Sequence, residues 1–175
     1  MSFTVIRDAI THEECDRILS IANNQWTAAD TQGESTARKS SIVWTEDRAT
    51  YKTIFQLRST LKKYAHYNIT GAEPMQITKY EGSGFYDFHY DGDGVTRINA
   101  PRTVLHNRVR KLSFSILLND DYVGGEFEFY GNKTPISAEK GTLIAFPSYM
   151  MHRVTPITWG TRYSLVTWFV GEQFK

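Results

Sequence analysis

The stretch MQITKYEGSGFYDFHY, from Met75 to Tyr90, decides the fold. Its two halves, Met75–Tyr80 and Phe85–Tyr90, are rich in aromatic and β-branched residues and flank the turn-forming residues Glu81–Gly84. Runs of the same kind follow at short intervals: Val109–Leu118, Gly125–Tyr130, Thr142–Phe146, Met151–Pro156 and Arg162–Val170. Short strands at this spacing predict a β-sandwich or barrel over residues 75–170.

Residues 1–74 have a more helical pattern. Thr11 and Glu14 have the spacing of a capping box at the start of a helix over His12–Ala22. Thr50–Tyr67 has an apolar stripe at helical spacing and predicts a second helix. We therefore expect one domain over 1–175, in which 1–74 supply supporting helices and strands around the core at 75–170. Phe3–Ile6 and Ser40–Trp44 are short candidate strands, and Gln25–Arg38 is a polar candidate loop.

The composition excludes several classes of protein. The net charge is +1, from 20 basic and 19 acidic residues, so no overall field attracts nucleic acid or an anionic membrane. The single cysteine, Cys15, excludes an internal disulfide and a cysteine-rich metal site, and its helical setting favours a buried residue over a reactive thiol. Without a secretory signal or a long apolar run, we expect a soluble, intracellular, cytoplasmic protein with no membrane partner.

Two histidines and one aspartate are candidate metal ligands. His89 and Asp91 lie two apart, so on a strand they point to one face. His152, on a later strand, is the candidate third ligand. Two histidines and a carboxylate form the facial triad of non-haem Fe(II) oxygenases, which leaves three positions open for a bidentate 2-oxo acid and O2. A His-x-Asp motif alone is weak, because a satisfied strand histidine and a turn aspartate produce the same pattern.

The final predicted strand supplies a candidate anchor for an acid. Arg162 stands ten residues after His152, and a turn through Thr158–Gly160 predicts that their strands lie side by side. A guanidinium at Arg162 would bind the distal carboxylate of 2-oxoglutarate through paired hydrogen bonds, and the Ser164 hydroxyl and the Tyr80 phenol could join it. Taken singly, Arg162 is better interpreted as a surface cation and Tyr80 as a core aromatic; their joint order and spacing favour the anchor instead.

These residues together resemble the prolyl 4-hydroxylase branch of the 2-oxoglutarate/Fe(II) dioxygenases, and the bacterial PKHD-type hydroxylases especially over Gly124–Trp168. The resemblance covers roughly Met75 to Val170. It implies a mainly β fold with flanking helices, built on a double-stranded β-helix (jelly-roll) core, with Trp168 on the far wall of the cavity. The motifs that carry it are Tyr80-Glu81-Gly82-x-Gly84, His89-x-Asp91, Gly124-Gly125-Glu126-Phe127, Gly141–Pro147, His152–Pro156 and Gly160–Ser164.

The chain departs from its relatives at two positions. Related hydroxylases often carry a second tyrosine where Leu117 stands, which puts the details of the 2-oxoglutarate cage in question. The nucleic-acid demethylases carry a second arginine where this chain has Trp168, which counts against base repair.

The resemblance implies Fe(II), 2-oxoglutarate and O2 as cofactor and cosubstrates, with ascorbate as an added cofactor. A peptidyl proline or another protein residue is the leading expected substrate, with succinate and CO2 as co-products. A small molecule, a nucleotide or a nucleic acid, a binding module without turnover, and a cupin-like isomerase are the alternatives. Gln25–Arg38 and Gly92–Lys111 are either lids over the substrate or solvated loops.

Overall fold

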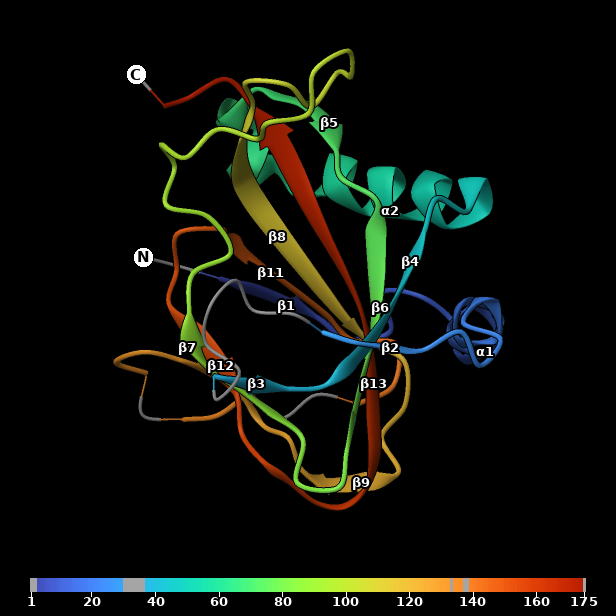
Figure 1. The fold of residues 1–175 in the computed structure, drawn as a ribbon. Helices are drawn as coiled ribbons and strands as arrows, with labels where there is room; N and C mark the ends of the chain where they lie inside the picture. Colours follow the sequence, from blue (N-terminus) through green and yellow to red (C-terminus); the bar gives the residue numbers. More distant parts are fainter. Residues whose placement is uncertain (1–2, 30–36, 133, 137–138, 175) are drawn as a thin grey trace.

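Two antiparallel sheets form the centre of the computed structural model, which describes residues 3–29, 37–132, 134–136 and 139–174 (Figure 1). Within these residues the larger sheet runs in the order β1 (Thr4–Ile6), β11 (Leu143–Pro147), β8 (Val109–Leu117), β13 (Ile157–Gly171), β6 (Met75–Glu81), β4 (Ser41–Thr45) and β2 (Thr27–Ala28). Two further strands, β5 (Ile69–Ala72) and β9 (Tyr122–Gly124), pair with β13. The smaller sheet has the order β10 (Phe127–Phe129), β12 (His152–Val154), β7 (Phe85–His89) and β3 (Arg38–Lys39).

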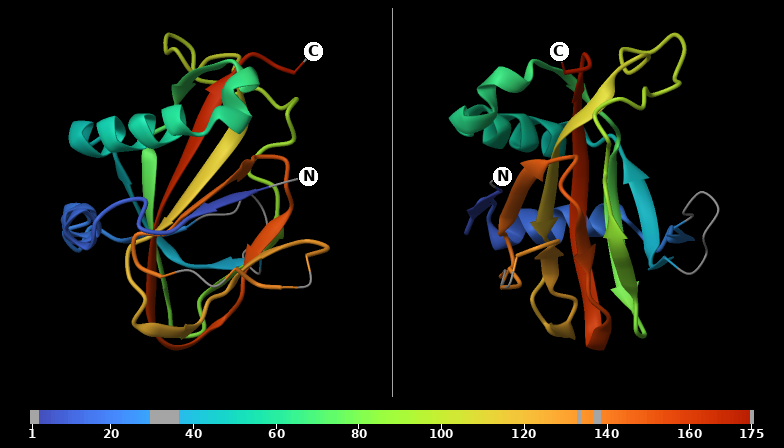
Figure 2. Two further views of the ribbon diagram at one scale, coloured as in Figure 1. Left: turned by 180° about the vertical axis from the view of Figure 1, so that it is seen from behind. Right: turned by 90° about the vertical axis from the view of Figure 1, so that its left-hand side faces the viewer.

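The larger sheet separates the helices from the smaller sheet. In Figures 1 and 2 the long strands β6, β8 and β13 lie between β7 and β12 on one side and two helices, α1 (His12–Ile21) and α2 (Arg48–Thr60), on the other. This is the expected mainly β, jelly-roll architecture with flanking helices. The site between the sheets is thus backed by a helix-covered wall.

Strand alternation divides the interior into two apolar clusters. On β11, Leu143 and Ala145 join the cluster beneath the helices, which also contains Ile18 of α1 and Ile54 of α2. Neighbouring side chains on β11 turn the other way: Ile144 and Phe146 join a second cluster between the two sheets. Both clusters therefore rest on the same short strands.

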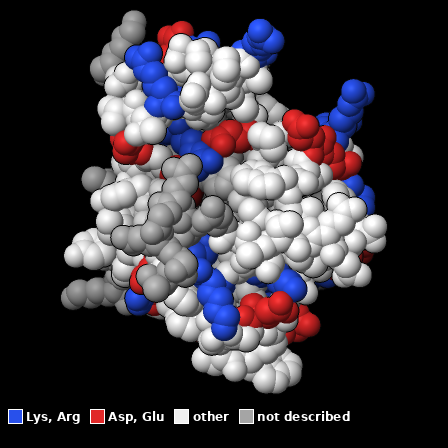
Figure 3. All heavy atoms as spheres, viewed as in Figure 1, with Lys and Arg blue, Asp and Glu red and all other residues white. Residues whose placement is uncertain are grey.

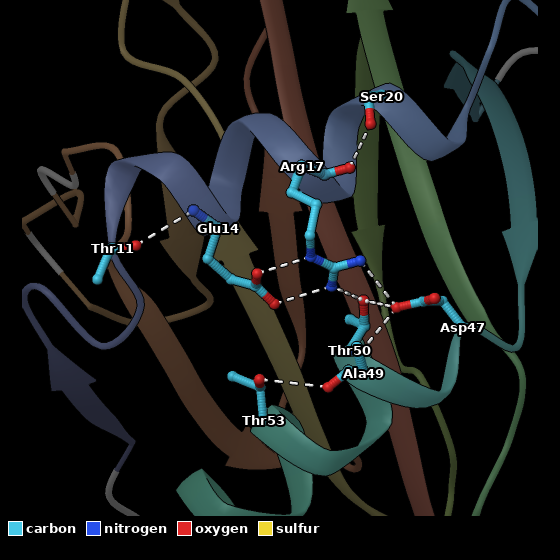
Figure 4. Close-up of polar contacts among 8 residues, drawn as sticks. All are labelled: Thr11, Glu14, Arg17, Ser20, Asp47, Ala49, Thr50 and Thr53. Carbon is cyan, nitrogen blue, oxygen red and sulfur yellow. Dashed lines mark hydrogen bonds and ion pairs between the residues drawn. The ribbon is translucent and has the colours of Figure 1, made fainter.

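A polar network joins the two helices (Figure 4). The Thr11 hydroxyl accepts from the Glu14 backbone N–H at 3.2 Å and caps α1. The Glu14 carboxylate does not complete the predicted capping box; it accepts from Arg17 at 2.7 and 2.9 Å. Arg17 also donates to Asp47, which caps α2 by accepting from the Thr50 N–H at 2.8 Å. Glu14 is drawn away from the cap because a guanidinium offers it two charge-assisted bonds.

The predicted second helix, Thr50–Tyr67, was wrong in its bounds. The α-helix begins at Arg48, because Asp47 and not Thr50 is its N-cap, and it ends at Thr60. Leu61, with φ −83° and ψ 70°, breaks the helix, and a 3₁₀ helix, η1 (Lys62–Tyr67), follows. The apolar stripe continues across this break because Tyr64 and Tyr67 remain buried.

The predicted pairing of the strands that carry His152 and Arg162 was also wrong. β12 pairs with β7 and β10 in the smaller sheet, whereas Thr158–Gly160 belongs to β13 and lies along β9 in the larger sheet. The chain crosses between sheets at Thr155-Pro156, and proline has no N–H with which to continue a strand ladder. His152 and Arg162 consequently stand on opposing sheets.

The two predicted loops differ in how far the structure describes them. Gly92 to Arg108 contains no helix or strand, as expected, but Arg110 and Lys111 belong to β8. The other prediction, Gln25–Arg38, falls partly on residues 30–36, outside the described residues, and its ends contribute β2 and β3. In the described part of the chain no helix has the length and apolar character needed to cross a membrane.

Candidate active site

His89, Asp91 and His152 come together between the sheets. His89 ends β7 and His152 begins β12, and the two are register partners across the antiparallel pair. The Asp91 N–H donates to the Ser148 carbonyl at 3.1 Å, which folds the chain after β7 back toward His152. One nitrogen or oxygen atom from each of the three side chains lies within 4.8 Å of the others. These three residues could hold one metal ion.

The two imidazoles are oriented by backbone carbonyls. His89 Nδ1 lies 2.7 Å from the Asp87 carbonyl oxygen, and His152 Nδ1 lies 2.9 Å from that of Met150. Because a carbonyl only accepts, each Nδ1 carries the proton and each Nε2 keeps a free lone pair. Burial, followed by the nearby His152, lowers the pKa of His89 to about 4. His89 is therefore neutral at pH 7 and able to bind a metal.

One oxygen of the Asp91 carboxylate lacks the partner that a buried anion requires. Its Oδ1 lies 3.7 Å from His89 Nε2 and its Oδ2 lies 3.8 Å from His152 Nε2, both beyond a hydrogen bond. Oδ2 is buried with no hydrogen bond among the described residues. Although burial alone raises the pKa of Asp91, His152 and His89 hold it below its usual value. An ionised, orphaned oxygen between two imidazole nitrogens fits a divalent cation.

Arg162 presents a buried cation to the same space. Its residue is 1% exposed, and its Nη1 donates to the Ser164 hydroxyl at 3.2 Å. Its Nε and Nη2 are buried and find no hydrogen-bond partner in the described residues. Gly125 gives the side chain its room, since a Cβ there would lie 2.9 Å from Arg162 Cδ. A guanidinium with unused, buried donors fits a carboxylate ligand.

One cavity connects these groups. Its volume is about 990 Å³, and the triad and Arg162 all line it. Tyr80 is the register partner of Arg162 on β6, and its ring lies 5.5 Å from the guanidinium. Trp168 forms part of the wall, and its indole N–H is buried without a partner. The cavity also contains Ser164, so it brings together every residue predicted for the site.

Comparison with known proteins decides the family. The profile of the 2OG-Fe(II) oxygenase superfamily matches residues 75–170, which is more than half of the chain. The chain belongs to this superfamily. The PKHD-type hydroxylase PiuC of Pseudomonas aeruginosa is 35% identical over 103 residues, which are 54% of this chain and 42% of PiuC. A PKHD-type hydroxylase of Alteromonas mediterranea is 32% identical over 110 residues, 57% of this chain and 46% of the relative.

The chain spans about half the length of the curated relatives that it matches. Solved structures show the same fold over nearly its whole length. The viral collagen prolyl hydroxylase of Paramecium bursaria Chlorella virus-1 has a TM-score of 0.75 at 22% identity, over 98% of this chain and 97% of the viral one. A Pseudomonas putida prolyl-4-hydroxylase has a TM-score of 0.73 at 18% identity, over 95% and 91% of the two chains.

The candidate site contains a partly buried ion pair that sequence reasoning missed. Arg110 donates to the Glu73 carboxylate at 2.6 and 2.8 Å and to the Asp91 backbone carbonyl at 3.0 Å. Its guanidinium lies 4.0 Å from the centre of the Trp168 ring. Arg110 falls in the segment Gly92–Lys111, which the sequence predicts to be a lid or a solvated loop. Nothing near Arg110 in the sequence identifies Glu73 as its partner. Its position as the second residue of the predicted strand Val109–Leu118 could have indicated that Arg110 belongs to the core sheet.

Leu117, the position of departure from the family, does not line the main cavity. It lines a smaller cavity of about 150 Å³ that also reaches Arg162. Ser115, two residues earlier on β8 and on the same face, lines the main cavity. The main cavity therefore contains a serine on β8 in addition to Ser164.

Proposed function

We propose that this chain is an Fe(II)- and 2-oxoglutarate-dependent dioxygenase that hydroxylates a peptidyl proline or another protein residue, with succinate and CO2 as co-products. One observation carries the proposal: a carboxylate oxygen without a partner between two imidazoles, and a buried guanidinium with unused donors, share one cavity. The first fits a metal and the second fits an acid, and the superfamily uses both together.

Each proposed residue has a role that follows from its position. His89, Asp91 and His152 would hold the iron, and Arg162 with Ser164 would bind the far carboxylate of 2-oxoglutarate. When bound, iron would activate O2, with one oxygen atom oxidising 2-oxoglutarate to succinate and CO2 and the other converting a substrate C–H bond to an alcohol. Tyr80 and Trp168 would wall the cosubstrate off from water. No side chain is needed as a general base.

The peptide substrate is supported by what related proteins act on. One solved structure of this fold, from Trichoplax adhaerens, is a prolyl hydroxylase in complex with a peptide fragment of hypoxia inducible factor. Basic and acidic side chains are interspersed on the face in Figure 3, which does not favour nucleic acid. A small molecule is the second candidate, because a cavity of about 990 Å³ is of the size that holds one. Ascorbate dependence and a cytoplasmic location stay predictions.

Succinate release tests the proposed function. The protein supplied with Fe(II), ascorbate, O2 and 2-oxoglutarate should form succinate slowly without a prime substrate, and faster with a proline-rich peptide that gains one oxygen atom in mass. Asp91→Ala should lower succinate release by more than roughly 100-fold. Loss of a residue that only hydrogen-bonds to a metal ligand already costs up to about that factor, and loss of the ligand itself should cost more. Wild-type protein that forms no succinate with any peptide or small molecule would remove the proposed activity.

A further inference from the structure

Arg38 places a second guanidinium in the cavity. It lies on β3, at the edge of the smaller sheet, and lines the cavity together with the triad. Its Nε donates to the Ser40 hydroxyl at 2.6 Å and its Nη2 to the Gln76 side-chain oxygen at 3.0 Å. Within the described residues Nη1 has no partner. Two neutral acceptors therefore fix the guanidinium while one edge stays available to a ligand.

Among the described residues, no carboxylate compensates the charge of Arg38. In the described part of the chain no ion pair includes this residue, and its other neighbour is the Tyr86 ring, 4.6 Å from the guanidinium carbon. Gln76, which holds it, is 4% exposed and also accepts from the Thr78 hydroxyl at 3.1 Å. A cation that is fixed by two neutral groups, one of them buried, and that has no counter-charge among the described residues is a site for an anion.

Among the described lining residues, Arg38 is the one whose charge stays unmatched when the proposed iron and 2-oxoglutarate are counted. Among the described lining residues the charged ones are Arg38, Asp91, Arg110 and Arg162. Arg110 is neutralised by Glu73. Under the proposed function, the two charges of Fe(II) and that of Arg162 match Asp91 and the two carboxylates of 2-oxoglutarate. One positive charge then remains, and the only component still to bind is the prime substrate.

Arg38 lies close enough to the metal end to act on the substrate near its reacting carbon. The Tyr86 ring stacks on the His89 imidazole with 3.4 Å between ring centres and an angle of 11°. Since Arg38 lies against Tyr86 as well, one aromatic ring separates its guanidinium from a proposed iron ligand. An anion bound by Arg38 would therefore lie in the same cavity as the proposed iron, one aromatic ring away from the ligand His89.

We propose that Arg38 selects substrates that carry a carboxylate beside the hydroxylated carbon. In a peptide this is an aspartate or glutamate next to the target residue; in a small substrate it is a free acid. The proposal rests on the proposed function for its charge balance, but the binding of an anion at Arg38 can be measured without turnover.

Matched acid and amide probes test this inference. The protein, loaded with Mn(II) and 2-oxoglutarate without O2, is titrated with peptide pairs that differ only in Asp or Asn beside proline, and with N-acetylproline against N-acetylprolinamide. We expect the acid of at least one pair to bind about tenfold more tightly. Arg38→Gln should abolish this preference and Arg38→Lys should retain part of it. Arg48→Gln, which removes an exposed charge outside the cavity, should leave it unchanged.

The outcomes separate this inference from the proposed function. A preference in the peptide pair alone identifies a peptide side chain as the anion, and a preference in the small pair alone identifies a free acid; both support the role of Arg38. Equal binding of acid and amide in both pairs, or a preference that survives in Arg38→Gln, overturns it. Succinate release without prime substrate should be the same in Arg48→Gln as in wild type. Its absence in wild type would instead count against the proposed function.

Discussion

The side chains on the two faces of the larger sheet have different roles: those on one face pack in the core and those on the other line the cavity. The face beneath α1 and α2 is apolar and closely packed, whereas the face toward the cavity is lined by polar groups, some of them without partners. Both faces come from the same strands, because successive residues point to opposite sides. Ile77, Phe114, Leu165 and Phe169 lie on the helix side, and Gln76, Thr78, Ser115, Arg162 and Ser164 lie on the cavity side.

Because of this difference, residues that stabilise the fold and residues that line the cavity alternate along one strand. On β13, Leu165 is packed in the core and its neighbour Ser164 lines the cavity beside Arg162. Substitutions on the helix side should therefore cost folding free energy, and substitutions on the cavity side should cost ligand binding. A substitution on the helix side that weakened ligand binding, or one on the cavity side that lowered stability, would contradict this division.

The largest effect on folding is expected at Phe114. It is fully buried beneath the helices, with its ring 4.8 Å from that of Phe169. Phe114→Ala should lower the free energy of unfolding by about 3–5 kcal/mol. Thermal unfolding measures this, and activity per folded molecule should stay unchanged. Phe55→Ala is the matched control, because Phe55 also contacts Phe169 but is 42% exposed, so its loss should be much smaller.

On the cavity side the largest effect is expected at Arg162. Arg162→Met removes the proposed carboxylate anchor and should raise the KM for 2-oxoglutarate about 100-fold. The same change removes two buried donors that have no partner in the described residues, so the melting temperature of the ligand-free protein should not fall. Unchanged use of 2-oxoglutarate, or a large loss of stability, would contradict the division of the two faces.

A smaller effect is expected at Glu73, which acts through Arg110. Glu73→Gln leaves Arg110 without its counter-charge and loosens its bond to the Asp91 carbonyl. Metal affinity should fall roughly 10- to 100-fold, because groups behind a metal ligand contribute on that scale. Isothermal titration with Mn(II) measures the loss. Glu139→Gln, which breaks the exposed pair with Arg7, is the control and should bind metal like wild type.

The smallest effect is expected at Cys15. Burial raises the pKa of this thiol to about 11, because an apolar surrounding disfavours the thiolate. Below pH 9 the native protein should not be alkylated by iodoacetamide, and one label should appear only after unfolding. Mass spectrometry counts the label. Rapid alkylation of folded protein would show that the helix side is less closed than its packing indicates.

Local patterns were sufficient to predict the strands of the core and to single out residues that the fold brings into one cavity. Alternating strands from Met75 onward predicted the mainly β fold, and the order of motifs placed His89, Asp91, His152 and Arg162 in one cavity. Such features depend on the chain's own period and on turns that residues nearby create.

Pairing between distant segments was not predictable in the same way. β12 and β13 were expected to be neighbours because a turn lies between them, but the chain changes sheets there. The Glu73–Arg110 pair and the placement of Arg38 by Gln76 join residues 37 and 38 positions apart. Nothing in either residue's surroundings in the sequence specifies its partner, so these contacts appear only in the folded chain.

Anaerobic titration with Fe(II) tests the central claim most directly, which is that His89 of β7, Asp91 just after β7 and His152 of β12 converge on one ion. Wild-type protein should bind one Fe(II) per chain, and Asp91→Ala and His152→Ala should each lose most of that affinity while remaining folded. If His152→Ala bound Fe(II) as tightly as wild type, the two strands would not share an ion and the account of this site would be wrong.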